Sequence, residues 1–74
     1  MIDSIALLDT FYYEYDDNEI HIFKILAMTN NDIGGYKECL ILFDDGSSGR
    51  FEITYSPKYG FLFDGYFKIK RIFL

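Results

Sequence analysis

Apolar and polar positions alternate in short runs along most of the chain, and no apolar stripe with the roughly 3.6-residue period of a helix lasts beyond two turns. β-branched and aromatic residues fill these runs, and Gly, Asp, Asn and Ser cluster between them, which is typical of strands joined by tight turns. The runs cover residues 4–15, 19–29, 36–43, 50–56, 59–63 and 66–73. The pattern predicts an all-β fold: a single small antiparallel meander of five or six strands over residues 1–74, forming a bent sheet or an SH3-like barrel.

The last two runs are separated by Asp64-Gly65, which predicts a two-residue type I′ turn because both of its central positions need positive φ. That register places Leu62, Phe67 and Ile69 on one face, which we expect to belong to the core. The opposite face carries the residues Tyr59, Phe61, Phe63, Tyr66, Lys68 and Lys70. Because lysine ammonium groups are not buried unpaired, this second face is the strongest candidate for a binding surface. The alternative is that its rings complete a closed barrel while the lysines extend past the rim.

Two earlier hairpins are predicted in the same way. Pairing Phe43 with Arg50 across the loop at residues 44–49 gives a strongly apolar face, which we expect to form the centre of the core: Leu40, Leu42, Phe51 and Ile53. A turn at Asp17-Asn18 groups another apolar set, Phe11, Tyr13, Tyr15, Ile20 and Ile22. The alternation slips at Ile22-Phe23, which predicts a β-bulge there.

Composition restricts the chemistry that this chain can support. Cys39 is the only cysteine and His21 the only histidine, so neither a disulfide nor a structural zinc site can stabilise the 74 residues. Cys39 lies in the most apolar run and is expected to be an inert buried thiol. No Ser/His or Cys/His arrangement is present, and we expect no enzyme activity, no metal and no cofactor.

Charge is divided between the two ends of the chain. Residues 1–45 hold ten acidic and two basic residues, a net charge of −8, and residues 46–74 hold two acidic and five basic residues, a net charge of +3, which together give −5. Such a division predicts either an internally neutralised fold or two surfaces of opposite sign.

Four acidic residues crowd the tip of the first hairpin, namely Glu14, Asp16, Asp17 and Glu19. A calcium loop would need oxygen ligands at alternate positions, a glycine at the sharp turn and a distant bidentate glutamate, and this segment lacks the last two. The alternatives are a solvated turn, since Asp and Asn favour turns, and an acidic docking patch for a basic partner.

The location is expected to be the cytoplasm, because the chain begins without a basic or apolar leader and a lone thiol suits a reducing compartment. The longest apolar run, residues 39–43, is far short of the roughly 20 residues that span a bilayer, so no membrane partner is expected. Short sheet edges and many large apolar side chains predict a homodimer.

These features predict a small non-enzymatic protein-binding module, an inhibitor or antagonist of a host protein. Ile, Phe, Tyr, Lys and Asn make up 33 of the 74 residues, a bias towards A/T-rich codons that is associated with many phages and mobile elements, so a counter-defence protein such as an anti-CRISPR is the leading hypothesis. Its acidic half would then block a partner, including one that binds nucleic acid. The alternatives are a small barrel that binds a nucleotide or single-stranded nucleic acid, including a cyclic-nucleotide sponge, and an immunity protein or structural subunit.

Overall fold

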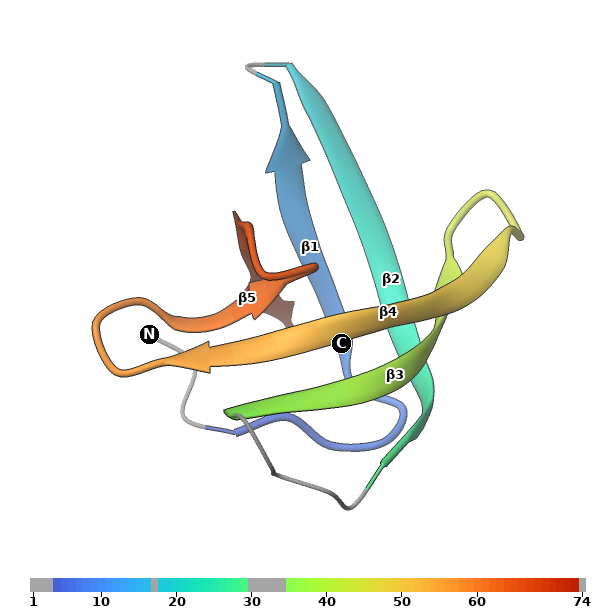
Figure 1. Cartoon of the computed structure of the whole chain (residues 1–74). Helices are drawn as coiled ribbons and strands as arrows, with labels where there is room; N and C mark the ends of the chain where they lie inside the picture. Colours follow the sequence, from blue (N-terminus) through green and yellow to red (C-terminus); the bar gives the residue numbers. More distant parts are fainter. Residues whose placement is uncertain (1–3, 17, 30–34, 74) are drawn as a thin grey trace.

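The computed structural model describes residues 4–16, 18–29 and 35–73 of the chain, and within them it contains seven strands and no α-helix (Figure 1). The strands are β1 (Thr10–Tyr15), β2 (Glu19–Met28), β3 (Tyr36–Phe43), β4 (Ser48–Ser56), β5 (Gly60–Phe63), β6 (Phe67–Lys68) and β7 (Lys70–Ile72). All observed pairings are antiparallel. The all-β prediction is confirmed, with a strand count slightly above the five or six expected.

The sheet is nearly closed into a barrel by its last segment. The strand order is β6-β5-β4-β3-β2-β1-β7, so the two edge strands are neighbours in sequence and are separated only by Ile69. The run predicted as one strand, residues 66–73, therefore pairs with β5 before Ile69 and with β1 after it. Ile69 itself is buried. In Figure 1 the β1–β2 hairpin stands upright, while β3, β4 and β5 run across it. Closure of this kind protects edges that would otherwise pair with other chains.

The predicted registers of all three hairpins are wrong: the first and last hairpins have three-residue loops, and β3 and β4 pair closer to their connecting loop than expected. Tyr15 pairs with Glu19, Phe63 pairs with Phe67, and Arg50 pairs with Leu40 instead of Phe43. Each difference is an odd number of residues, and an odd slip moves one strand's side chains to the opposite face. The faces predicted from alternation were therefore combined incorrectly across every hairpin.

The turn at Asp64-Gly65 shows why the local prediction was right and the register wrong. Asp64 has φ of 54° and Gly65 has φ of 71°, as a type I′ turn requires, and the Tyr66 amide donates to the Phe63 carbonyl at 3.0 Å. Tyr66 nevertheless stays outside the ladder, and Phe67 takes the position opposite Phe63. One residue of difference after a correctly predicted turn places Phe63 and Phe67 on the same face.

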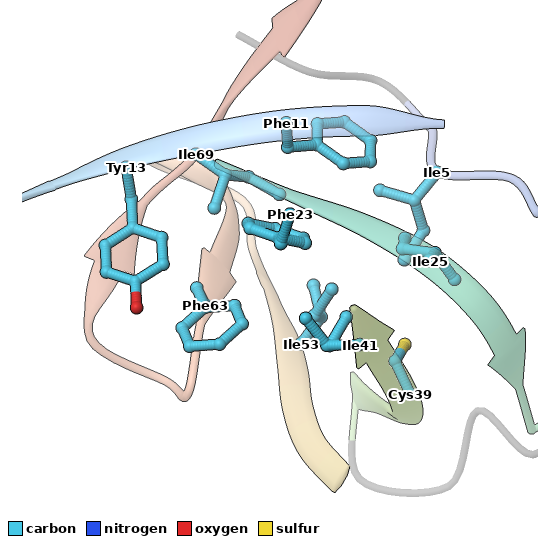
Figure 2. Close-up of a cluster of buried hydrophobic side chains, with 10 residues drawn as sticks. All are labelled: Ile5, Phe11, Tyr13, Phe23, Ile25, Cys39, Ile41, Ile53, Phe63 and Ile69. Atoms are coloured by element: carbon cyan, nitrogen blue, oxygen red, sulfur yellow. The ribbon is translucent and has the colours of Figure 1, made fainter. Parts of the chain in front are cut away.

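Among the described residues, ten side chains form the buried core, Ile5, Phe11, Tyr13, Phe23, Ile25, Cys39, Ile41, Ile53, Phe63 and Ile69 (Figure 2). Of the four residues predicted as its centre, Ile53 is buried and Phe51 packs against the cluster. Leu40 and Leu42 are on the outside, because Cys39 and Ile41 occupy the interior positions of β3. The prediction of a buried thiol is confirmed, and burial raises the pKa of Cys39 to about 11.

A β-bulge is present in β2, but it lies at Leu26 and not at Ile22-Phe23. The pairing with β3 shifts by one residue between Ile25 and Ala27. Because of this extra residue, the inward alternation of Phe23 and Ile25 continues at Met28, which packs against the core. The bulge thus keeps both ends of the longest strand in contact with the interior.

The predicted first strand begins only at Thr10, and residues 4–9 close one end of the barrel instead. The Arg71 guanidinium donates to the Ser4 carbonyl and forms an ion pair with Asp9 at 3.3 Å. It also lies 5.4 Å from the centre of the Phe11 ring. These contacts join the N-terminal segment to β7.

Candidate functional site

A cleft of about 280 Å³ opens where the first strand meets the last segment of the chain. It is lined by Tyr12, Tyr13, Glu14, Tyr66, Phe67, Lys68 and Lys70, and we call it the seam cleft. The pairing of β1 with β7 ends at Tyr12 and Lys70, and continuing the same register would place Glu14 opposite Lys68. The cleft therefore lies where hydrogen-bonded pairing between β1 and the C-terminal segment stops.

Aromatic rings of the core form the floor of the seam cleft. The Tyr13 ring stacks on Phe67 with 4.9 Å between centroids and on Phe63 with 4.6 Å. Figure 2 shows Tyr13 and Phe63 side by side at one end of the buried cluster. Burial is the main cause that raises the pKa of the Tyr13 hydroxyl above its ordinary value, with smaller contributions from the charges of Asp64 and Tyr15.

Two lysines and an exposed tyrosine form the rim. The Lys68 ammonium lies 4.6 Å from the centre of the Tyr59 ring, and the Lys70 ammonium lies 5.9 Å from that of Tyr12, which are cation–π distances. Within the described part of the chain neither lysine forms an ion pair with a carboxylate. Tyr66 is 78% exposed and contacts Phe67 edge-on. The rim thus presents two cations and a free ring face to solvent.

The predicted binding face is only partly assembled. Tyr66, Lys68 and Lys70 line the seam cleft, and Tyr59 is adjacent to it through Lys68. Phe61 is half-buried and packs against the core and Tyr55. Phe63 is only 2% exposed, so its assignment to an exposed face was wrong: the three-residue loop turns it inward.

The sequence prediction missed the β1 residues Tyr12 and Tyr13 and also Phe67, which had been assigned entirely to the core. No local pattern links Tyr12 with Lys70, since they are brought together only by the pairing of β1 with β7. A weaker signal was present in the alternation of β1, which puts adjacent tyrosines on opposite faces.

A second candidate surface lies on the outer face of the β1–β2 hairpin. Ile20 is 59% exposed and Ile22 is half-buried, although both were predicted to share a face with Phe11 and Tyr13. The register explains the difference, because Tyr13 pairs with His21 and Phe11 with Phe23, which leaves the isoleucines on the outward side of β2. Two aliphatic side chains therefore lie on the outside of the barrel.

Acidic residues from two hairpin tips lie near these isoleucines. The Asp44 amide donates to the Ile22 carbonyl at 3.0 Å, so the β3–β4 loop lies against β2. Asp45 accepts hydrogen bonds from the Ser47 hydroxyl at 2.6 Å and amide at 2.8 Å, and these bonds lower its pKa. The Glu19 carboxylate lies 3.3 Å from the His21 ring, on the other side of β2. We define the hairpin face as Ile20, Ile22, Asp16, Asp44 and Asp45.

The sequence predicted only part of this acidic set. Asp16 belongs to the hairpin face, Glu19 contacts His21 on the other side of β2, and Glu14 lines the seam cleft. Asp17 lies outside the described residues. Asp44 and Asp45 were missed, because only the packing of the two hairpins brings the β3–β4 tip to β2.

Neither a metal-binding cluster nor a membrane-spanning helix is found in the described ranges. Residues 4–16, 18–29 and 35–73 contain no group of three or more His, Cys, Asp or Glu side chains placed to hold a metal ion. The same ranges contain no helix long and apolar enough to cross a bilayer.

Comparisons with protein-family models, curated proteins and solved structures found no match to this chain. The seam cleft and the hairpin face are therefore the features from which a function can be inferred.

Proposed function

We propose that this chain is a small non-enzymatic protein-binding module, and that it docks on a basic surface of a partner protein through the hairpin face. The observation that carries the proposal is Ile20, a large aliphatic side chain that is 59% exposed on the outside of a regular strand. Contiguous exposed apolar surface with a polar rim is typical of protein interaction sites.

Charge indicates the kind of partner. The hairpin face holds Asp16, Asp44 and Asp45 beside the isoleucines, and the whole chain has a net charge of −5. A partner with basic residues around an apolar patch would be complementary to this face, and opposite charge accelerates association. Nucleic-acid-binding proteins commonly carry basic surfaces.

Occupation of such a basic surface would make the chain an antagonist. A barrel without a recognisable set of catalytic residues can act by covering a site, and this suits an inhibitor encoded by a phage or mobile element, including a counter-defence protein. The proposed place of action is the cytoplasm of the host.

Affinity capture from host lysate, followed by purification of the captured protein, tests the proposal. We expect Ile20→Lys to abolish binding to that purified partner, because it places a cation at the centre of the acidic face. Leu26→Lys is the matched control, since Leu26 is an exposed aliphatic residue at the β2 bulge, away from the hairpin tip.

The expected pattern is loss of binding for Ile20→Lys, retained binding for Leu26→Lys, and weakening by added salt. If Ile20→Lys binds as the unmodified chain does, the hairpin face is not the docking surface. If no protein is captured at a stoichiometric amount, the proposed function itself is contradicted.

A further inference from the structure

We infer that the seam cleft is a second binding site, which takes a nucleobase with its attached phosphate, as found in a free nucleotide or in a single strand. This inference is independent of the proposed protein partner. It rests on the shape of the cleft, on two lysines that form no ion pair in the described ranges, and on an exposed tyrosine ring. The hairpin face requires none of these features.

The size of the cleft suits one planar group. Its volume of about 280 Å³ is just below the roughly 300–1,000 Å³ that small-molecule sites usually occupy. The floor formed by Tyr13 and Phe67 is held by stacking within the core, so it is in place before a ligand arrives. Tyr66 adds an exposed ring at the mouth, on which a base can stack.

The cations indicate that the ligand is anionic. The chain has 12 acidic residues, yet Lys68 and Lys70 make no ion pair within the described ranges. Their ammonium groups lie instead over the rings of Tyr59 and Tyr12, beside the cleft and available to a phosphate. A net charge of −5 disfavours duplex DNA, whose binding depends on neutralising many phosphates, and it disfavours a single base with one or two phosphates much less.

Glu14 gives the site a preference among bases. Its side chain lines the cleft together with Lys68 and Lys70 and is not consumed by an ion pair with either of them. A carboxylate repels phosphate but accepts a hydrogen bond from an exocyclic amino group such as N4 of cytosine. We therefore assign the phosphate to the lysine side and the amino edge of the base to Glu14, with cytosine favoured over thymine.

Fluorescence anisotropy with short labelled oligo-dC and oligo-dT measures the predicted binding. We expect tighter binding of oligo-dC, and Tyr66→Ser should weaken it by at least about fivefold, as loss of one stacking ring does. The double variant Lys68→Gln with Lys70→Gln should reduce the slope of log K against log salt by about 1.4, because two phosphate contacts contribute roughly 0.7 each. Glu14→Gln should remove the preference for oligo-dC.

Matched controls are available on other surfaces. Tyr36→Ser removes an exposed tyrosine at the start of β3, and Lys24→Gln removes an exposed lysine on the outside of β2; both should bind as the unmodified chain does. Ile20→Lys should also leave oligonucleotide binding unchanged, which separates this site from the hairpin face.

Three results would overturn the inference: no saturable binding of either oligonucleotide, unchanged binding by Tyr66→Ser, or equal weakening by Lys24→Gln. Equal affinity for oligo-dC and oligo-dT would overturn the assignment of Glu14. Competition with cytidine monophosphate identifies the source of the ligand: efficient displacement indicates a free nucleotide, and weak displacement indicates a single strand.

Discussion

The seam cleft and the hairpin face lie on paired neighbouring strands, β1 and β2, but differ in how they are joined to the core. Tyr13 points inward from β1, where its ring stacks on Phe63 and Phe67 and forms the floor of the cleft. Ile20 and Ile22 point outward from the neighbouring strand and belong to no part of the buried cluster. The cleft is therefore an extension of the core, whereas the hairpin face lies on its outside.

This difference predicts how each surface tolerates substitution. A change in the floor of the cleft removes core contacts and costs stability whatever it does to binding. A change in the hairpin face removes little buried surface, so its effect on binding can be measured in a folded protein. Charge separates the two surfaces as well: two lysines and one glutamate line the cleft, whereas the charged members of the hairpin face are all aspartates.

The largest expected effect is at Phe63, which links the cleft floor to the rest of the core. Its ring lies 5.0 Å from both Phe23 and Phe51, so Phe63→Ala should reduce the free energy of unfolding by about 3–5 kcal/mol. That is a large share of the roughly 5–15 kcal/mol typical of small domains. Urea denaturation measures the loss, and Tyr66→Ser is the control that should unfold at nearly the same concentration. Unchanged stability of Phe63→Ala would mean that Phe63 is a surface residue after all.

Self-association is the next expected effect, and it concerns a third surface. Phe73 is 85% exposed and Leu8 is 66% exposed, and both line a hollow of about 310 Å³ beside β7. We expect a dimer at micromolar concentration, because exposed apolar groups of this kind usually mark interfaces. Phe73→Ser should give a monomer, and Ile20→Ser should remain dimeric. Sedimentation of the unmodified chain as a single 8.7 kDa species would contradict the expectation.

A smaller effect on stability is expected at the hairpin face. Ile20→Ser should change the free energy of unfolding by no more than about 0.5 kcal/mol, as exposed substitutions usually do. Thermal and urea unfolding both measure it, with Ile25→Ser as the contrasting variant, since Ile25 is fully buried in the same strand. A large loss of unfolding free energy in both variants would show that the hairpin face contributes to the core.

The smallest expected effect is a difference in pH dependence between the two regions. Burial raises the pKa of Tyr13 above its ordinary value of 10.0, so the stability linked to it is present below pH 10 and is lost as the pH rises through the folded pKa. The pKa of Asp45 is lowered from 3.8 by Ser47, so its contribution is present above that pH and is lost as the pH falls through the folded pKa. Urea unfolding across pH should show that Tyr13→Phe flattens only the alkaline limb and Asp45→Asn only the acid limb.

The sequence by itself determined the fold class, the approximate limits of most strands and the positions of the turns. Short β-branched and aromatic runs cannot form an amphipathic helix, and Asp-Gly and Asp-Asn pairs favour tight turns, so these features follow from local preferences. The buried thiol of Cys39 and the end of β4 at Ser56, before Pro57, also followed from local composition. Three of the six residues of the predicted binding face, Tyr66, Lys68 and Lys70, line one cleft.

Only the tertiary structure decided the registers, and with them which side chains are inside. A strand's alternation defines two faces without stating which is buried. A third loop residue in the first and last hairpins reversed the pairing of those faces, which places Phe63 inside and Ile20 outside. The closure of the barrel at Ile69 joined Lys70 to Tyr12, and the packing of the hairpins joined Asp44 to Ile22. These contacts connect residues that are distant in sequence, and their energy depends on how the sheet bends as a whole, which no short stretch of the chain encodes.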